Sequence, residues 1–136
     1  MKIVLDANVI VAAFATRGLC TEIFKFSIDA CEVYASEELL LECTQVLRKK
    51  LKVPSKTVDK FTSFLREQFH LINPATVDAD ACRDQSDLHV LGVAQGSNSK
   101  FIISGDKDLL ELKKFKKTKI YSPRQFWDYV NSLRQT

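Results

Sequence analysis

The stretch Lys2-Ile-Val-Leu-Asp6-Ala-Asn8-Val-Ile-Val11 is the part of the sequence from which the fold can be read. Its apolar run, Ile3 to Leu5, is typical of a central strand that is covered on both faces. The run ends at Asp6, and open α/β sheets bind their ligands at the carboxyl ends of strands. Asp6 is therefore a candidate for chemistry, although an aspartate here can also simply cap a helix that begins near Asn8.

Outward from this stretch, apolar patterns of two kinds alternate along the chain. Strands are expected at residues 3–5, 32–35, 71–72, 101–103 and 120–121, and helices at residues 9–14, 20–30, 36–47, 56–69, 84–96, 109–112 and 123–133. Alternating strands and helices favour parallel pairing with helices on both faces of the sheet. The sequence therefore predicts an α/β fold, a three-layer α/β/α sandwich with a mainly parallel central sheet, in one domain of residues 1–136.

Composition excludes several classes of protein. The 20 Lys and Arg residues exceed the 17 Asp and Glu residues by only three, which is too small an excess to indicate nucleic-acid binding by itself. The four cysteines are widely spaced and form no zinc motif, so we expect reduced thiols in a cytoplasmic protein. No apolar stretch approaches the roughly 20 residues of a membrane span, and we expect neither secretion nor a membrane anchor.

Four acids are expected to meet at one edge of the predicted sheet. Asp6 and Asp106 each follow a buried strand, while Glu42 and Asp87 lie in the early turns of helices that start from the same edge. Like charges repel unless a cation neutralises them, and a site made only of oxygen ligands suits Mg²⁺ or Mn²⁺ better than zinc. The convergence predicts a site for one of these ions.

Each acid also has a structural interpretation. Asp84 and Asp87 are spaced as the first and last residues of a capping box, which accounts for both carboxylates without any chemistry. Glu42 borders an apolar helix face and can equally be a solvated glutamate near Arg48 and Lys49.

Four motifs together give the sequence a specific resemblance. They are Leu-Asp6-Ala-Asn8, Ser36-Glu-Glu-Leu-Leu-Leu-Glu42, Arg83-Asp84-x-x-Asp87-x-x-x-Leu-x-x-Ala94 and Ile-Ser104-Gly-Asp106-Lys-Asp108-Leu-Leu. In this order and spacing the chain resembles the PIN-domain nucleases, particularly the VapC-like toxins of toxin–antitoxin systems. The resemblance extends from Lys2 to about Trp127, and departs from the common pattern at Ala7 and Gln85.

The resemblance implies an enzyme, an Mg²⁺- or Mn²⁺-dependent endoribonuclease that cleaves single-stranded RNA and leaves a 5′-phosphate and a 3′-hydroxyl. It implies an antitoxin as a protein partner, and it leaves a homodimer open. The residues it implicates fall into two groups. Catalysis and metal binding map to Asp6, Glu42, Asp87 and Asp106, and orientation of the site maps to Asn8, Ser104, Asp84 and Asp108.

Two basic segments, residues 48–52 and 113–119, are candidates for carrying the RNA backbone to the acids, with solvated surface as the alternative. The candidate substrate-binding residues are Arg48, Lys49, Lys50, Lys113, Lys114, Lys116 and Lys117. The two histidines, His70 and His89, lie outside the motif positions, and we expect structural roles for both.

Two other functions compete with the nuclease. The run up to Asp6, with a later Gly-Asp106-x-Asp108, is also similar to haloacid-dehalogenase-type phosphatases, in which the first Asp is a nucleophile. That family has a second Asp two residues later, where this chain has Asn8. The other competitor is a non-catalytic module that keeps the fold and binds RNA or a protein, against which the retention of all four acids argues.

Overall fold

The computed structural model describes residues 1–134, and its elements alternate as the sequence predicts. In chain order they are β1 (Lys2–Leu5), α1 (Ala7–Ala15), α2 (Leu19–Ala30), β2 (Glu32–Ala35), α3 (Glu37–Gln45), the π-helical turn η1 (Val46–Lys50), α4 (Ser55–Gln68), β3 (His70–Leu71), the 3₁₀ turns η2 (Ala79–Ala81) and η3 (Gln85–Asp87), α5 (Leu88–Ser97), β4 (Phe101–Ile103), α6 (Lys107–Leu112), β5 (Lys114–Phe115), β6 (Thr118–Tyr121) and α7 (Pro123–Arg134).

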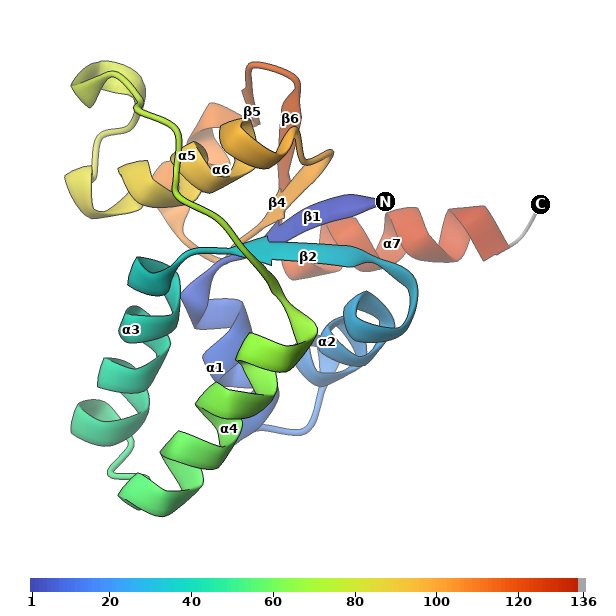
Figure 1. Cartoon of the computed structure of the whole chain (residues 1–136). Coiled ribbons are helices and arrows are strands. Elements are labelled where there is room, and N and C mark those ends of the chain that lie inside the picture. Colours follow the sequence, from blue (N-terminus) through green and yellow to red (C-terminus); the bar gives the residue numbers. More distant parts are fainter. Residues whose placement is uncertain (135–136) are drawn as a thin grey trace.

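The sheet has the strand order β3-β2-β1-β4-β6-β5, and every neighbouring pair is parallel except β5 with β6. Figure 1 shows α5 and α6 on one side of the sheet and α1, α2 and α7 on the other, with α3 and α4 beside α1. This arrangement confirms the predicted three-layer fold with a mainly parallel sheet.

The two central strands form the middle of the core. All residues of β4, and Ile3 to Leu5 of β1, have no exposed surface. Burial on both faces explains why these strands are continuous apolar runs without the alternation of a half-exposed strand. Because β1 pairs with β2 on one side and β4 on the other, it joins the part of the chain before residue 73 to the part after residue 100.

Several local expectations are corrected by the structure. The first helix begins at Ala7, directly after Asp6, and not at residue 9. Residues 84–96 form the 3₁₀ turn η3 followed by α5, and not one helix with a capping box. The third helix stops being α-helical at Gln45 and continues as the wider turn η1. The expected strand at residues 120–121 is the second half of β6, which begins at Thr118 and pairs with β5 in a hairpin. The sequence did not predict β5 or the start of β6, because these short segments carry no apolar pattern.

A long connection leads from β3 to α5 and crosses the surface of α5 at Gly92. The Ala75 N–H donates to the Gly92 carbonyl (2.9 Å), and a Cβ at Gly92 would lie 2.5 Å from the carbonyl oxygen of Ala75. Glycine therefore permits the close approach. Figure 1 shows this connection as the yellow-green segment that follows α4. Within residues 1–134, no helix combines the length and apolar character needed to cross a lipid bilayer.

Candidate functional site

Five carboxylates line one cavity at the carboxyl edge of the sheet. The cavity has a volume of about 370 Å³, and its acidic lining residues are Asp6, Glu42, Asp84, Asp87 and Asp106. Asp6 follows β1 and Asp106 lies just beyond β4, while Glu42 comes from α3 and the other two from η3 and its cap. The structure thus brings together the four residues to which the sequence assigned catalysis, and adds Asp84 to them.

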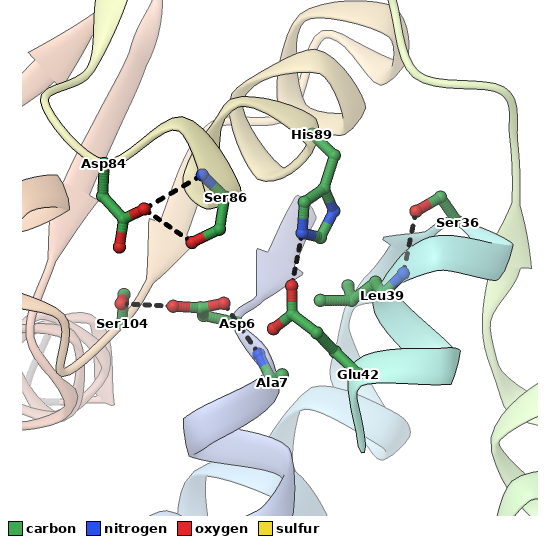
Figure 2. A network of polar contacts seen from close by, with 9 residues as sticks. All are labelled: Asp6, Ala7, Ser36, Leu39, Glu42, Asp84, Ser86, His89 and Ser104. Atoms are coloured by element: carbon green, nitrogen blue, oxygen red, sulfur yellow. Dashed lines mark hydrogen bonds and ion pairs between the residues drawn. The ribbon is translucent and has the colours of Figure 1, made fainter. Parts of the chain in front are cut away.

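Asp6 is held in a fixed orientation by both of its carboxylate oxygens. Oδ1 accepts from the Ala7 N–H (2.8 Å) at the start of α1, and Oδ2 accepts from the Ser104 hydroxyl (2.7 Å), as Figure 2 shows. The side chain is 4% exposed. Burial raises its pKa, and the Glu42 and Asp106 charges add to this, while the two hydrogen bonds oppose it. Asp6 caps α1 and also lines the acidic cavity, so a structural role and a chemical role are compatible for this residue.

Asp106 is fixed by the start of α6. Its Oδ1 accepts from the backbone N–H groups of Asp108 (2.8 Å) and Leu109 (3.2 Å), and its own N–H donates to the Ser104 hydroxyl (2.9 Å). Ser104 thus connects Asp6 to Asp106. Asn8 accepts from the Gly105 N–H (3.3 Å) and holds the same loop. Asp108 contributes its backbone N–H to this arrangement, but its carboxylate does not line the cavity.

Asp87 is a buried acid whose ionised form the cavity disfavours. It is 8% exposed, and its Oδ2 is buried without a hydrogen-bond partner among the described residues. Burial, followed by the charges of Asp106 and Asp6, raises the pKa of Asp87 to about 7. Ligand oxygens of Asp84, Asp87 and Asp106 lie within 4.8 Å of one another.

A divalent cation fits this donor set. Crowded carboxylate oxygens, one of them buried and unpartnered, are the ligands that Mg²⁺ and Mn²⁺ prefer. A cation would offset the burial and the repulsion that raise the Asp87 pKa. Asp84 also serves as the cap of η3, since its Oδ1 accepts from the Ser86 N–H (3.0 Å) and hydroxyl (2.7 Å). The Asp87 N–H donates to the Asp84 backbone carbonyl and not to its side chain, so Asp84 caps η3 without the predicted capping box.

His89 belongs to the site, contrary to the expectation that it is a structural residue away from the motifs. Its Nε2 lies 2.5 Å from Glu42 Oε1, as Figure 2 shows. Burial lowers the His89 pKa, but the hydrogen bond and charge of Glu42, with the charges of Glu38 and Asp6, raise it overall. The periodicity of the sequence could not predict this contact, because it depends on how α3 packs against α5. His70 lies elsewhere, exposed on β3 and stacked on Tyr34.

The basic candidates separate into different parts of the molecule. Lys50, at the end of η1, lines the acidic cavity, whereas Arg48 forms an ion pair with Asp59 (2.6 Å) and Lys49 is exposed outside the cavity. Lys113, Lys114, Lys116 and Lys117 lie around the β5–β6 hairpin. Because Lys119 of β6 pairs with Phe101 at the amino end of β4, the hairpin lies at the edge of the sheet opposite the acids.

Comparison with known proteins shows the family of the chain and its similarity to solved structures. Residues 2–108 match the model of the PIN domain family. The crystal structure of VapBC2 from Rickettsia felis, bound to a DNA fragment from their promoter, is similar with a TM-score of 0.60 and 12% sequence identity, over 90% of this chain and 98% of that chain. At this identity the likeness shows a shared fold. No curated protein sequence matches the chain.

Proposed function

Because the chain belongs to the PIN domain family, we propose that it is a divalent-metal-dependent ribonuclease that hydrolyses phosphodiester bonds of single-stranded RNA. PIN domains are generally metal-dependent nucleases, which gives the coarse class. The observation that carries the finer proposal is the cavity lined by Asp6, Glu42, Asp87 and Asp106, with the buried and unpartnered Oδ2 of Asp87. We further propose that residues 1–136 act as one catalytic domain.

Asp6, Glu42, Asp87 and Asp106 would hold Mg²⁺ or Mn²⁺, with Asp84 close enough to contribute. A divalent ion, when bound, neutralises charge on the scissile phosphate and makes water easier to deprotonate. The protein's own contribution is orientation. Ser104 and the Ala7 N–H fix Asp6, and the first turn of α6 fixes Asp106, so these acids need no rearrangement to act.

Lys50 supplies the positive charge in the same cavity. A lysine ammonium is a strong donor to phosphate oxygens, and Lys50 lines the same cavity as carboxylates that would otherwise repel RNA. We propose that Lys50 contacts a phosphate of the bound strand, while Arg48 is kept in its ion pair with Asp59.

The family match favours the nuclease over the haloacid-dehalogenase alternative, and the retained acids favour it over a non-catalytic module. We also propose that the protein is the toxin of a toxin–antitoxin pair that acts in the cytoplasm. The motif resemblance supports this, as does the fold shared with VapBC2. Growth arrest on expression of the wild type, and normal growth on expression of Asp6→Asn, is the expected result in cells.

The decisive test is cleavage of single-stranded RNA by purified wild-type protein and Asp6→Asn. Asparagine keeps the size of Asp6 but removes the charge that would bind a cation. Cleavage by the wild type should require Mg²⁺ or Mn²⁺, stop on chelation, and fall by at least about 100-fold in the variant. Equal cleavage by both proteins would rule out the proposed site, and a covalent phosphoryl group on Asp6 would instead indicate the phosphatase.

A further inference from the structure

We infer that His89 is a positioning residue that holds the Glu42 carboxylate in place for the metal ion. The inference rests on the proposed function and concerns the one contact between the acidic cavity and a histidine. His89 Nε2 and Glu42 Oε1 are 2.5 Å apart, and the two residues come from different helices, α5 and α3. The His89 side chain is 7% exposed, whereas that of Glu42 is 39% exposed.

The direction of the hydrogen bond follows from the chemistry of the two groups. An ionised carboxylate only accepts, so Nε2 carries the proton and donates to Oε1. The other ring nitrogen, Nδ1, is buried and has no partner among residues 1–134. The ring therefore has a single polar contact, and that contact is with Glu42.

Glu42 needs such a contact more than the other acids do. Asp6 and Asp106 accept hydrogen bonds from backbone N–H groups at helix starts, which fix their carboxylates. Asp87 has a shorter side chain and is buried. Glu42 has a longer side chain in the second turn of α3, is partly exposed, and has no backbone donor to its carboxylate within the described part of the chain. Without His89 its carboxylate is free to turn toward solvent.

The contact engages Oε1 alone and leaves Oε2 available for a cation (Figure 2). Groups that hydrogen-bond to metal ligands hold those ligands in orientation, and their loss typically weakens metal binding by 10- to 100-fold. His89 lies two residues after Asp87, which ends η3 and caps α5, so the start of α5 places both an acid of the cavity and the residue that orients another.

The test measures Mn²⁺ binding by calorimetric titration of the protein without RNA. His89→Leu removes the donor and fills the apolar space, and we expect an affinity about 10- to 100-fold weaker than that of the wild type. His89→Gln places an amide N–H near the position of Nε2 and should recover most of the lost affinity. His70→Leu is the matched control, because His70 is exposed on β3 away from the cavity, and should bind Mn²⁺ as the wild type does.

A second comparison separates positioning from a general contribution to the packing of α3 on α5. If His89 acts through Glu42, His89→Leu should cause no further loss of Mn²⁺ affinity in a Glu42→Gln background. A loss of the same size in both backgrounds would overturn the inference. So would a His89→Leu protein that binds Mn²⁺ as tightly as the wild type, even if its unfolding temperature is lower.

These readouts also distinguish this inference from the proposed function. A wild type that binds Mn²⁺ and cleaves RNA, with a His89→Leu variant of unchanged affinity, would overturn only the role of His89. A wild type that binds no Mn²⁺ would overturn the metal-dependent activity and the role of His89 together. If His89→Leu does not fold, the comparison of His89→Gln with His89→Asn decides, because Asn is too short to reach Glu42 and should lose the affinity that Gln keeps.

Discussion

At Asp87, both burial and neighbouring negative charges disfavour the ionised carboxylate. Burial and the neighbouring charges of Asp106 and Asp6 raise its pKa to about 7, well above the ordinary value of 3.8. In the metal-free protein, folding therefore opposes ionisation of this carboxyl group. A cation bound as proposed would offset this cost.

The raised pKa of Asp87 predicts how the stability of the metal-free protein depends on pH. Between about pH 4 and pH 7 the folded protein binds a proton on Asp87 that the unfolded chain has released, so the free energy of unfolding falls as pH rises through this window. We expect urea unfolding in chelator to show lower stability at pH 8 than at pH 5, and Mn²⁺ to remove much of the difference.

Asp87→Asn is the control for that pH effect, because it cannot ionise. The variant should lose the part of the decrease in stability between pH 5 and pH 8 that Asp87 causes, while the raised pKa values of Asp6 and His89 contribute a decrease of the same sign. It should be at least as stable as the wild type at pH 8 without metal. A decrease that persists unchanged in Asp87→Asn would show that other groups cause it.

At the scale of elements, the turn η1 determines which basic residue faces the acids. The Leu51 N–H donates to the Val46 carbonyl (3.1 Å) and the Val53 N–H to the Leu47 carbonyl (2.9 Å), a wider spacing than that of an α-helix. This widening shifts the residues that follow it around the helix axis, and Lys50 reaches the cavity while Lys49 does not.

Lys50→Gln and Lys49→Gln make a matched pair, since each removes one positive charge from the same turn. We expect Lys50→Gln to raise KM for RNA roughly tenfold through the loss of one charged hydrogen bond, with little change in kcat. Lys49→Gln should leave KM within about twofold of the wild type. Equal effects of the two substitutions would mean that only the net charge of the segment matters.

The close approach at Gly92 predicts a cost for a larger residue. Alanine is the better helix former, but its Cβ would be forced to within 2.5 Å of the Ala75 carbonyl oxygen and 2.9 Å of Pro74 Cβ. We expect Gly92→Ala to destabilise the protein by about 1–3 kcal/mol in urea unfolding. Gly96→Ala, where the nearest atom is the flexible end of Ile72 at 3.3 Å, should cost less; a stabilised Gly92→Ala would contradict the rigid contact.

The sequence predicted the elements that are defined by local pattern. The apolar runs before Asp6 and before Ser104 gave β1 and β4, and the parallel sheet then implied that Asp6 and Asp106 lie on one edge. Glu42 and Asp87 were placed at the same edge because they lie in the early turns of helices that start there, and the family resemblance then assigned all four acids to the metal site. The contact of His89 with Glu42 joins residues 47 positions apart, and it depends on how two helices pack, which no local pattern encodes.

Across the whole molecule, the parallel sheet separates negative from positive charge. The acids gather at the carboxyl edge, whereas Lys100, Lys114 and Lys119 lie on adjacent strands or just before them at the amino edge, with the hairpin lysines beside them. The net charge of +3 is small, although these acids and lysines lie at opposite edges of the sheet. If RNA binds at the acids as proposed, we expect a short strand not to reach the hairpin.

This separation predicts that the hairpin lysines act only on longer RNA. Replacing Lys113, Lys114, Lys116 and Lys117 with Gln should leave cleavage of an RNA of about 4 nucleotides unchanged. For an RNA of about 20 nucleotides it should reduce the slope of log affinity against log salt by as much as about 3. An unchanged slope with the longer RNA would make these lysines plain surface.

The pairing of β1 with β4 has a consequence for a cleaved chain. Asp6 and Glu42 precede β3, whereas Asp87 and Asp106 follow the long connection that crosses Gly92. A protease cut in that connection would leave two fragments, each with half of the acids and one of the two central strands. The fragments should remain associated more tightly in Mn²⁺ than in chelator, because an ion bound by ligands from both fragments exists only in the associated form. In this sense the cation would act as a cross-link between the two halves of the chain.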